Sequence, residues 1–90
     1  MNLKDFLNES INRYCTINYR YATIEIEFIP KKFSSDEHQA REYALKWGRD
    51  LHKLVGIEDD FITISLLGPS GAIEIILFPV KALTFKIPHN

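Results

Sequence analysis

The last third of the chain carries apolar residues on both sides of a predicted strand. A strand with one buried face alternates apolar and polar residues along its length. Between Gly71 and Pro79 the residues of one parity are Ile73, Ile75 and Leu77, and those of the other are Ala72, Glu74, Ile76 and Phe78. One covering layer cannot bury both sets, so the second face needs a cover of its own.

Two helices are predicted from apolar residues that recur at three- and four-residue steps. The first spans Asn2 to Tyr14. The second spans Ser34 to Val55, with Ser34 as N-cap and Glu37 completing a capping box. Gly48 lies inside the second helix, where glycine costs about 1 kcal/mol relative to alanine. This helix is about 30 Å long at 1.5 Å per residue, enough to cross a small sheet, and its Trp47 is expected in the core.

Four strands are predicted from β-branched and aromatic runs between turn signals. Their ranges are Tyr19–Ile29, Phe61–Leu67, Gly71–Pro79 and Lys81–Pro88. In the first strand the apolar parity changes near Ala22, as a β-bulge or a turn after Tyr21 would produce. The second and third strands form a hairpin around the turn Gly68-Pro69-Ser70-Gly71. The fourth is predicted at a sheet edge because prolines flank it.

The order α-β-α-β-β-β predicts an α+β two-layer sandwich, in one domain of residues 1–90. Its mostly antiparallel four-stranded sheet would carry the one long helix packed on one face. The apolar residues assigned to that face are Ile24, Ile26, Phe28, Ile62, Ile64, Leu66, Ile73, Ile75 and Leu77. The opposite face would then display Ile29, Phe61, Leu67, Ile76 and Phe78.

This second apolar face is the predicted binding surface. Burial of each large apolar side chain is worth about 1.5–3 kcal/mol, and monomers rarely expose several in contact. The first helix, a second copy of the chain or a different protein could cover it. Tyr19, Arg20 and Tyr21 join the predicted partner-binding set, because tyrosine and arginine are enriched at binding hot spots. The alternative for the tyrosines is packing beneath the first helix.

Composition and charge narrow the class of protein. The chain is 46% hydrophobic and 26% charged, which is ordinary for a globular protein. Its net charge is −1 and its basic residues are scattered, which argues against nucleic acid as the partner. A weak nucleic-acid contact remains a further alternative, through Arg13, Arg20, Lys31 and Lys32.

The same features favour a cytoplasmic protein without a membrane segment. A single cysteine, Cys15, cannot form an internal disulfide. The N-terminus has no apolar signal-like core, and no apolar run approaches the ~20 residues that span a bilayer.

No catalytic residue, metal or cofactor is predicted, since no metal-ligand or nucleotide motif occurs. Glu25, Glu27 and Glu74 could gather on one outward face and hold a hard cation, although a solvated acidic face is the simpler interpretation. The sequence therefore favours a small protein-interaction module: an adaptor, inhibitor or non-catalytic subunit that binds a partner or itself. The alternative is a small enzyme or ligand-binding domain with a site across a homodimer, where Cys15 and the three glutamates would be tested first.

Overall fold

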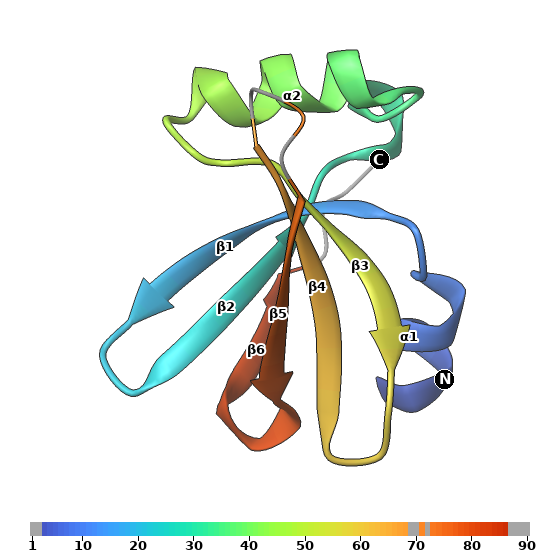
Figure 1. Ribbon diagram of the computed structural model, residues 1–90, viewed down its shortest axis with the longest axis vertical. Helices are drawn as coiled ribbons and strands as arrows, with labels where there is room; N and C mark the ends of the chain where they lie inside the picture. Colours follow the sequence, from blue (N-terminus) through green and yellow to red (C-terminus); the bar gives the residue numbers. More distant parts are fainter. Residues whose placement is uncertain (1–2, 69–70, 72, 87–90) are drawn as a thin grey trace.

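The computed structural model describes residues 3–68, 71 and 73–86, which form one six-stranded sheet with two α-helices (Figure 1). The helical elements are α1 (Leu3–Glu9), α2 (Glu37–Lys46) and the 3₁₀ turns η1 (Lys31–Phe33) and η2 (Val80–Ala82). The strands are β1 (Tyr14–Arg20), β2 (Thr23–Phe28), β3 (His52–Ile57), β4 (Phe61–Leu67), β5 (Ile73–Pro79) and β6 (Leu83–Lys86).

The strand order is β5-β4-β3-β1-β2-β6, and every pair is antiparallel except β2 with β6. The α+β class with one main helix agrees with the prediction. The four-stranded sheet is wrong, because the first predicted strand is a hairpin and the end of the predicted long helix is a strand.

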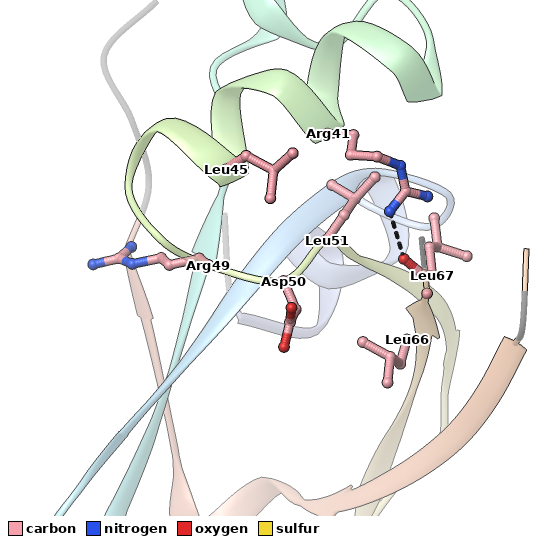
Figure 2. A pocket seen from close by; sticks show the side chains of 8 residues that line it. Arg41, Leu45, Arg49, Asp50, Leu51, Leu66 and Leu67 are labelled. Carbon is pink, nitrogen blue, oxygen red and sulfur yellow. Dashed lines mark hydrogen bonds between the residues drawn. The ribbon is translucent and has the colours of Figure 1, made fainter. Parts of the chain in front are cut away.

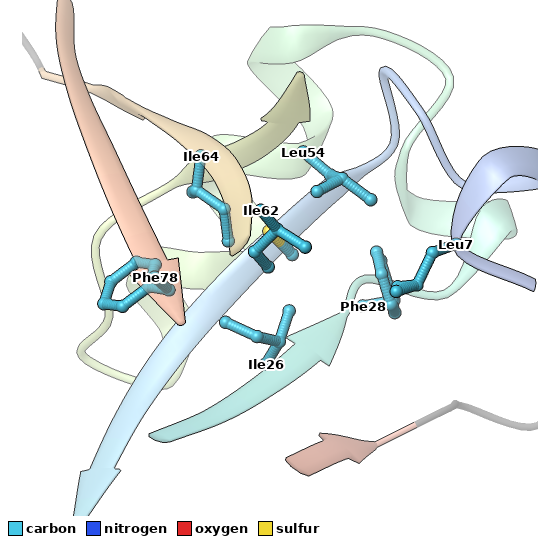
Figure 3. Close-up of a cluster of buried hydrophobic side chains, with 8 residues drawn as sticks. Leu7, Ile26, Phe28, Leu54, Ile62, Ile64 and Phe78 are labelled. Atoms are coloured by element: carbon cyan, nitrogen blue, oxygen red, sulfur yellow. The ribbon is translucent and has the colours of Figure 1, made fainter. Parts of the chain in front are cut away.

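The sheet curls so strongly that its two edge strands contribute to the same core. Phe78 of β5 and Phe85 of β6 come from opposite ends of the strand order, and both belong to the main hydrophobic cluster. Leu7 of α1 is buried in it too (Figure 3). The buried members are Leu7, Cys15, Ile26, Phe28, Leu54, Ile62, Ile64 and Phe78. The curled sheet and α1 therefore enclose this core, and the predicted sandwich of a long helix on one sheet face is wrong.

The helix α2 lies across one end of the sheet (Figure 1). Its buried side is narrow, since Ala40 and Ala44 pack against Ile29 and Leu51 in a second, smaller cluster. Such small side chains let the helix backbone approach the end of the sheet closely. The second cluster thus anchors α2 independently of the main core.

The helix starts two residues later than predicted. The carboxylate of Asp36 accepts a hydrogen bond from the backbone N–H of Gln39 at 2.8 Å, which makes Asp36 the N-cap. Ser34, the C-cap of η1, instead donates its hydroxyl to the carbonyl of Pro30. The predicted capping box is therefore wrong by two positions.

The prediction of one helix from Ser34 to Val55 is also wrong, because the chain leaves the helical conformation at Gly48. Gly48 has a φ of 69°, and its N–H donates to the carbonyl of Leu45 at 2.9 Å. After this cap the chain enters β3, where Leu54 points into the main core. Pairing of β3 with both β1 and β4 outweighs the local helical pattern.

Gly48→Ala tests whether the helix ends at Gly48, because the change in stability has opposite signs for the two alternatives. Inside a helix the substitution would stabilise the protein by about 1 kcal/mol. At a left-handed residue it is expected to destabilise by about 1–2 kcal/mol, because Cβ then crowds the following carbonyl oxygen. An added Cβ meets no atom within 4 Å, so only the backbone contributes. Urea unfolding of both proteins measures the change, and a stabilised variant would contradict the boundary.

The segment predicted as one strand from Tyr19 to Ile29 belongs to the β1–β2 hairpin. Tyr21 adopts the left-handed conformation in the turn, with a φ of 49°. The pairs Cys15 with Phe28 and Ile17 with Ile26 place apolar side chains of both strands on the inner face. The turn after Tyr21 is thus the correct explanation of the parity change.

The predicted β4–β5 hairpin is confirmed, whereas the predicted inner face of β5 is wrong. Ile62 and Ile64 of β4 are buried as expected, and they pair with Phe78 and Ile76. Paired residues share a face, so a register that differs by one residue turns every side chain of β5 over. The turn positions Pro69 and Ser70, together with Asn2, Ala72 and Pro88, lie outside the described residues.

Candidate interaction surface

The edge strand β5 presents three large aliphatic side chains to solvent. Ile73, Ile75 and Leu77 are 68%, 58% and 60% exposed, and we call these three residues the β5 strip. They lie on the outer face because the inner parity of β5 is occupied by Ile76 and Phe78. The sequence pattern assigned them to the core, and only the register of β5 against β4 could have corrected this.

The backbone of β5 is open on one side among the described strands. β5 pairs with β4 alone, so its other edge presents N–H and C=O groups that no described strand engages. Edge strands are usually protected by charged side chains, by a bulge, by a central proline or by shortness. β5 has seven residues and a regular register, with Glu74 as its one charged residue and Pro79 at its end. The other edge, β6, has four residues and ends in Lys86.

The residues predicted for partner binding fall into several environments. Ile29 and Phe78 are 1% and 5% exposed in the two clusters, so the expectation that they lie on an uncovered face is wrong. Ile76 and Leu67 are partly buried against the same clusters. Phe61, at the start of β4, is 36% exposed. The curl of the sheet hides most of the predicted second face.

Three further predicted residues lie at the tip of the β1–β2 hairpin. Tyr19, Arg20 and Tyr21 are all exposed there. The ring of Tyr19 leans against Phe78 with centroids 6.4 Å apart, which ties the tip to the main core. The expectation of packing beneath the first helix therefore does not describe Tyr19 or Tyr21.

The candidate acidic cluster does not assemble. Glu25 and Glu27 lie on β2 and Glu74 lies on β5, strands with three others between them in the sheet. Glu27 accepts a hydrogen bond from Nη1 of Arg49 at 2.6 Å, so its charge is neutralised. Within the part of the chain that the structure describes, no three His, Cys, Asp or Glu residues are placed to hold a metal ion.

Cys15 is unsuited to nucleophilic chemistry. Its side chain has no exposed surface, and burial raises the pKa of the thiol to about 12. The reactive form is the thiolate, which this environment disfavours. Arg13, a candidate nucleic-acid contact, has its guanidinium over the ring of Phe28 at 5.1 Å, and burial lowers the pKa of Arg13. Arg13 is therefore half-buried against the main core.

Two depressions adjoin the loop between α2 and β3. The first, of about 240 Å³, lies between α2 and the end of β4 (Figure 2). Arg41 closes it by donating from Nη1 to the carbonyl of Leu67 at 2.8 Å, and Arg49 extends away from it. The space of about 240 Å³ that remains beside this arginine is smaller than the ~300–1,000 Å³ of usual small-molecule sites.

The second depression, which we call the hollow, has a volume of about 640 Å³. Its apolar wall comes from Ile17, Leu66 and Ile76 on the inner faces of β1, β4 and β5. Tyr19 and Trp47 also line it, and they are 66% and 64% exposed. Trp47 was expected in the core, and it is exposed because α2 ends there, at the residue before Gly48. In the sequence, Gly48 was the residue that could have indicated the end of the helix and therefore the exposure of Trp47.

The polar lining of the hollow includes Arg49, Asp50 and His52. The side chains of Arg49 and Asp50 diverge, and the Asp50 carboxylate points away from Arg41 (Figure 2). His52 is 8% exposed, and its Nδ1 lies 3.1 Å from the carbonyl oxygen of Asp50. Burial lowers the pKa of His52, so the imidazole is neutral at pH 7. The hollow is thus lined by apolar and aromatic side chains, and Asp50 provides its one charge that is not balanced by a described ion pair.

Comparison with known proteins gives no relative. No family model matches the chain, and neither the curated proteins nor the solved structures contain a significant match. Among the described residues there is also no helix with the length and apolar character that a membrane crossing requires.

Proposed function

We propose that the protein is a non-catalytic interaction module whose β5 edge pairs with a β-strand of another polypeptide, in the first instance a second copy of itself. The observation that carries this proposal is the β5 strip, three aliphatic side chains at 58–68% exposure on a strand with an open edge. An added strand satisfies the backbone groups of that edge, and its outer-face side chains pack beside the strip as cross-strand pairs.

Pairing with a second copy is favoured because β5 is complementary to itself. In an antiparallel pair centred on Ile75, that residue faces its own copy and Ile73 faces Leu77, all on the outer face. The two Glu74 carboxylates then lie opposite Ile76 and not opposite each other, so no like charges meet. The strip of one copy would continue that of the other across an extended sheet.

The oligomeric state of an Ile75→Lys variant tests this proposal. The lysine would bring two ammonium groups together at the centre of the pair and remove the cross-strand contact between the two isoleucines. The lost apolar pair is worth about 0.2–1 kcal/mol and the opposed like charges add to that loss, so the dissociation constant is expected to rise by about tenfold. Sedimentation velocity over a range of concentrations measures it against the 10.5 kDa chain mass.

Thr84→Lys on the other edge strand is the matched control. Thr84 is exposed on β6, so the variant adds the same charge to an edge that the proposal leaves free, and its dimer is expected to persist. A wild-type protein that stays monomeric at every concentration would contradict pairing with a second copy. An apolar dye that binds wild type and Ile75→Lys equally would contradict the strip as an exposed apolar surface.

A further inference from the structure

The hollow beside the α2–β3 loop carries a second inference, which does not depend on the β5 edge. Exposed aromatic residues are costly, because burial of a large apolar side chain is worth about 1.5–3 kcal/mol. Tyr19 and Trp47 nevertheless remain about two-thirds exposed, and they line one hollow of about 640 Å³ from separate parts of the chain. That volume lies within the ~300–1,000 Å³ of usual small-molecule sites.

The charges around the hollow select the ligand. Arg49, the cation that lines it, is neutralised by Glu27 at 2.6 Å. His52 is neutral at pH 7, because burial lowers its pKa. Asp50 is exposed, and no described residue forms an ion pair with its carboxylate. Among the residues that line the hollow, the charge that no described ion pair balances is therefore negative.

We propose that the hollow binds a compact organic cation of the alkylammonium class, with Tyr19 and Trp47 contacting its alkyl shell and Asp50 supplying the countercharge. The negative faces of aromatic rings attract such cations, most strongly on tryptophan. A quaternary ammonium group cannot be matched by hydrogen bonds, so aromatic contact and a nearby carboxylate are its principal means of recognition. The head group belongs to a free small molecule or to a methylated lysine side chain, and these share the same chemistry.

Intrinsic fluorescence reports binding directly, because Trp47 is the single tryptophan of the chain. Titration with tetramethylammonium and with choline is expected to change the emission of Trp47 in a saturable way. The neutral isostere 3,3-dimethyl-1-butanol has the shape of choline without its charge, and it is expected to bind about tenfold more weakly. Peptides that carry trimethyllysine or unmodified lysine distinguish a side-chain ligand from a free one.

Two variants test the roles of Asp50 and Tyr19 in cation binding. Asp50→Asn and Tyr19→Leu are each expected to weaken choline binding by about tenfold, through the countercharge and the aromatic face respectively. Glu58→Gln is the matched control, since Glu58 is an exposed acid in the β3–β4 turn outside the hollow, and its affinity should equal that of the wild type. Circular dichroism checks that each variant keeps the fold.

Three results would overturn the proposal. The first is a neutral isostere that binds as tightly as choline, because the site would then recognise the shape of the ligand and not its charge. The second is an unchanged affinity in both Asp50→Asn and Tyr19→Leu. The third is an emission change no greater than that of N-acetyltryptophanamide under the same additions, which would mean that the cation contacts any exposed indole.

Discussion

Replacement of Phe28 by alanine is expected to lower the free energy of unfolding by about 3–5 kcal/mol. Phe28 is 1% exposed and makes aromatic contacts on two sides. Its ring meets Phe6 of α1 edge-on at 5.6 Å and stacks on Phe85 of β6 at 6.3 Å. The loss combines the missing burial of the ring with a cavity where α1 and β6 meet the sheet.

Urea denaturation of wild type and variant measures this loss. Phe33→Ala is the matched control, because Phe33 is 36% exposed on η1 and stacks on Tyr43 outside the main core. Its loss should be well below that of Phe28→Ala. A chain of this size has a total stability of about 5–13 kcal/mol, so Phe28→Leu provides a milder variant that stays folded. Equal losses at positions 28 and 33 would contradict the placement of the core.

The thiol of Cys15 is expected to react with a disulfide reagent at pH 8 at least about a thousandfold more slowly in the native protein than in urea. The side chain has no exposed surface, and its pKa is raised to about 12 by burial, so little thiolate is present and none is accessible. Labelling must therefore wait for an unfolding event. The time course of release of the reagent's thiol product measures the reaction rate in the native protein and in urea.

The two predictions are linked through the opening equilibrium. If Cys15 reacts only from the unfolded state, Phe28→Ala should raise the native labelling rate by about a hundredfold or more, in line with its lost stability. Thr84→Cys in a Cys15→Ala background is the control, because position 84 is exposed and should react at once. Rapid labelling of Cys15 in the folded protein would show that the thiol is accessible, and would contradict the conclusion that Cys15 is unsuited to nucleophilic chemistry.

Local patterns predicted much of the secondary structure. The apolar, β-branched runs of β4 and β5, with the glycines and the proline between them, predicted that hairpin correctly. Short-range turn chemistry and a two-residue period are properties of neighbouring residues, so they can be read without the fold. The parity change near Ala22 also located the turn of the β1–β2 hairpin, although a continuous strand was preferred.

The end of α2 shows where local pattern failed. The residues from Leu51 to Val55 fit a helical stripe, and Gly48 was read as a tolerated interruption of it. In the folded protein Gly48 ends the helix, and Leu54 is buried between neighbours in β1 and β4. The sequence contains both signals, but the partners of β3 lie far away along the chain. Their pairing decided between helix and strand.

The candidate sites depended on the tertiary structure even more strongly. The sequence by itself determined that apolar residues occupy both parities of β5, so that some of them needed a cover beyond a single layer. Which parity faces solvent was decided by the register of β5 against β4, because a shift of one residue exchanges the two faces. The hollow depended likewise on the end of α2, which placed Trp47 at the surface near Tyr19. Composition and periodicity are local properties, whereas register, curl and the meeting of distant side chains are set by the packing of the whole chain.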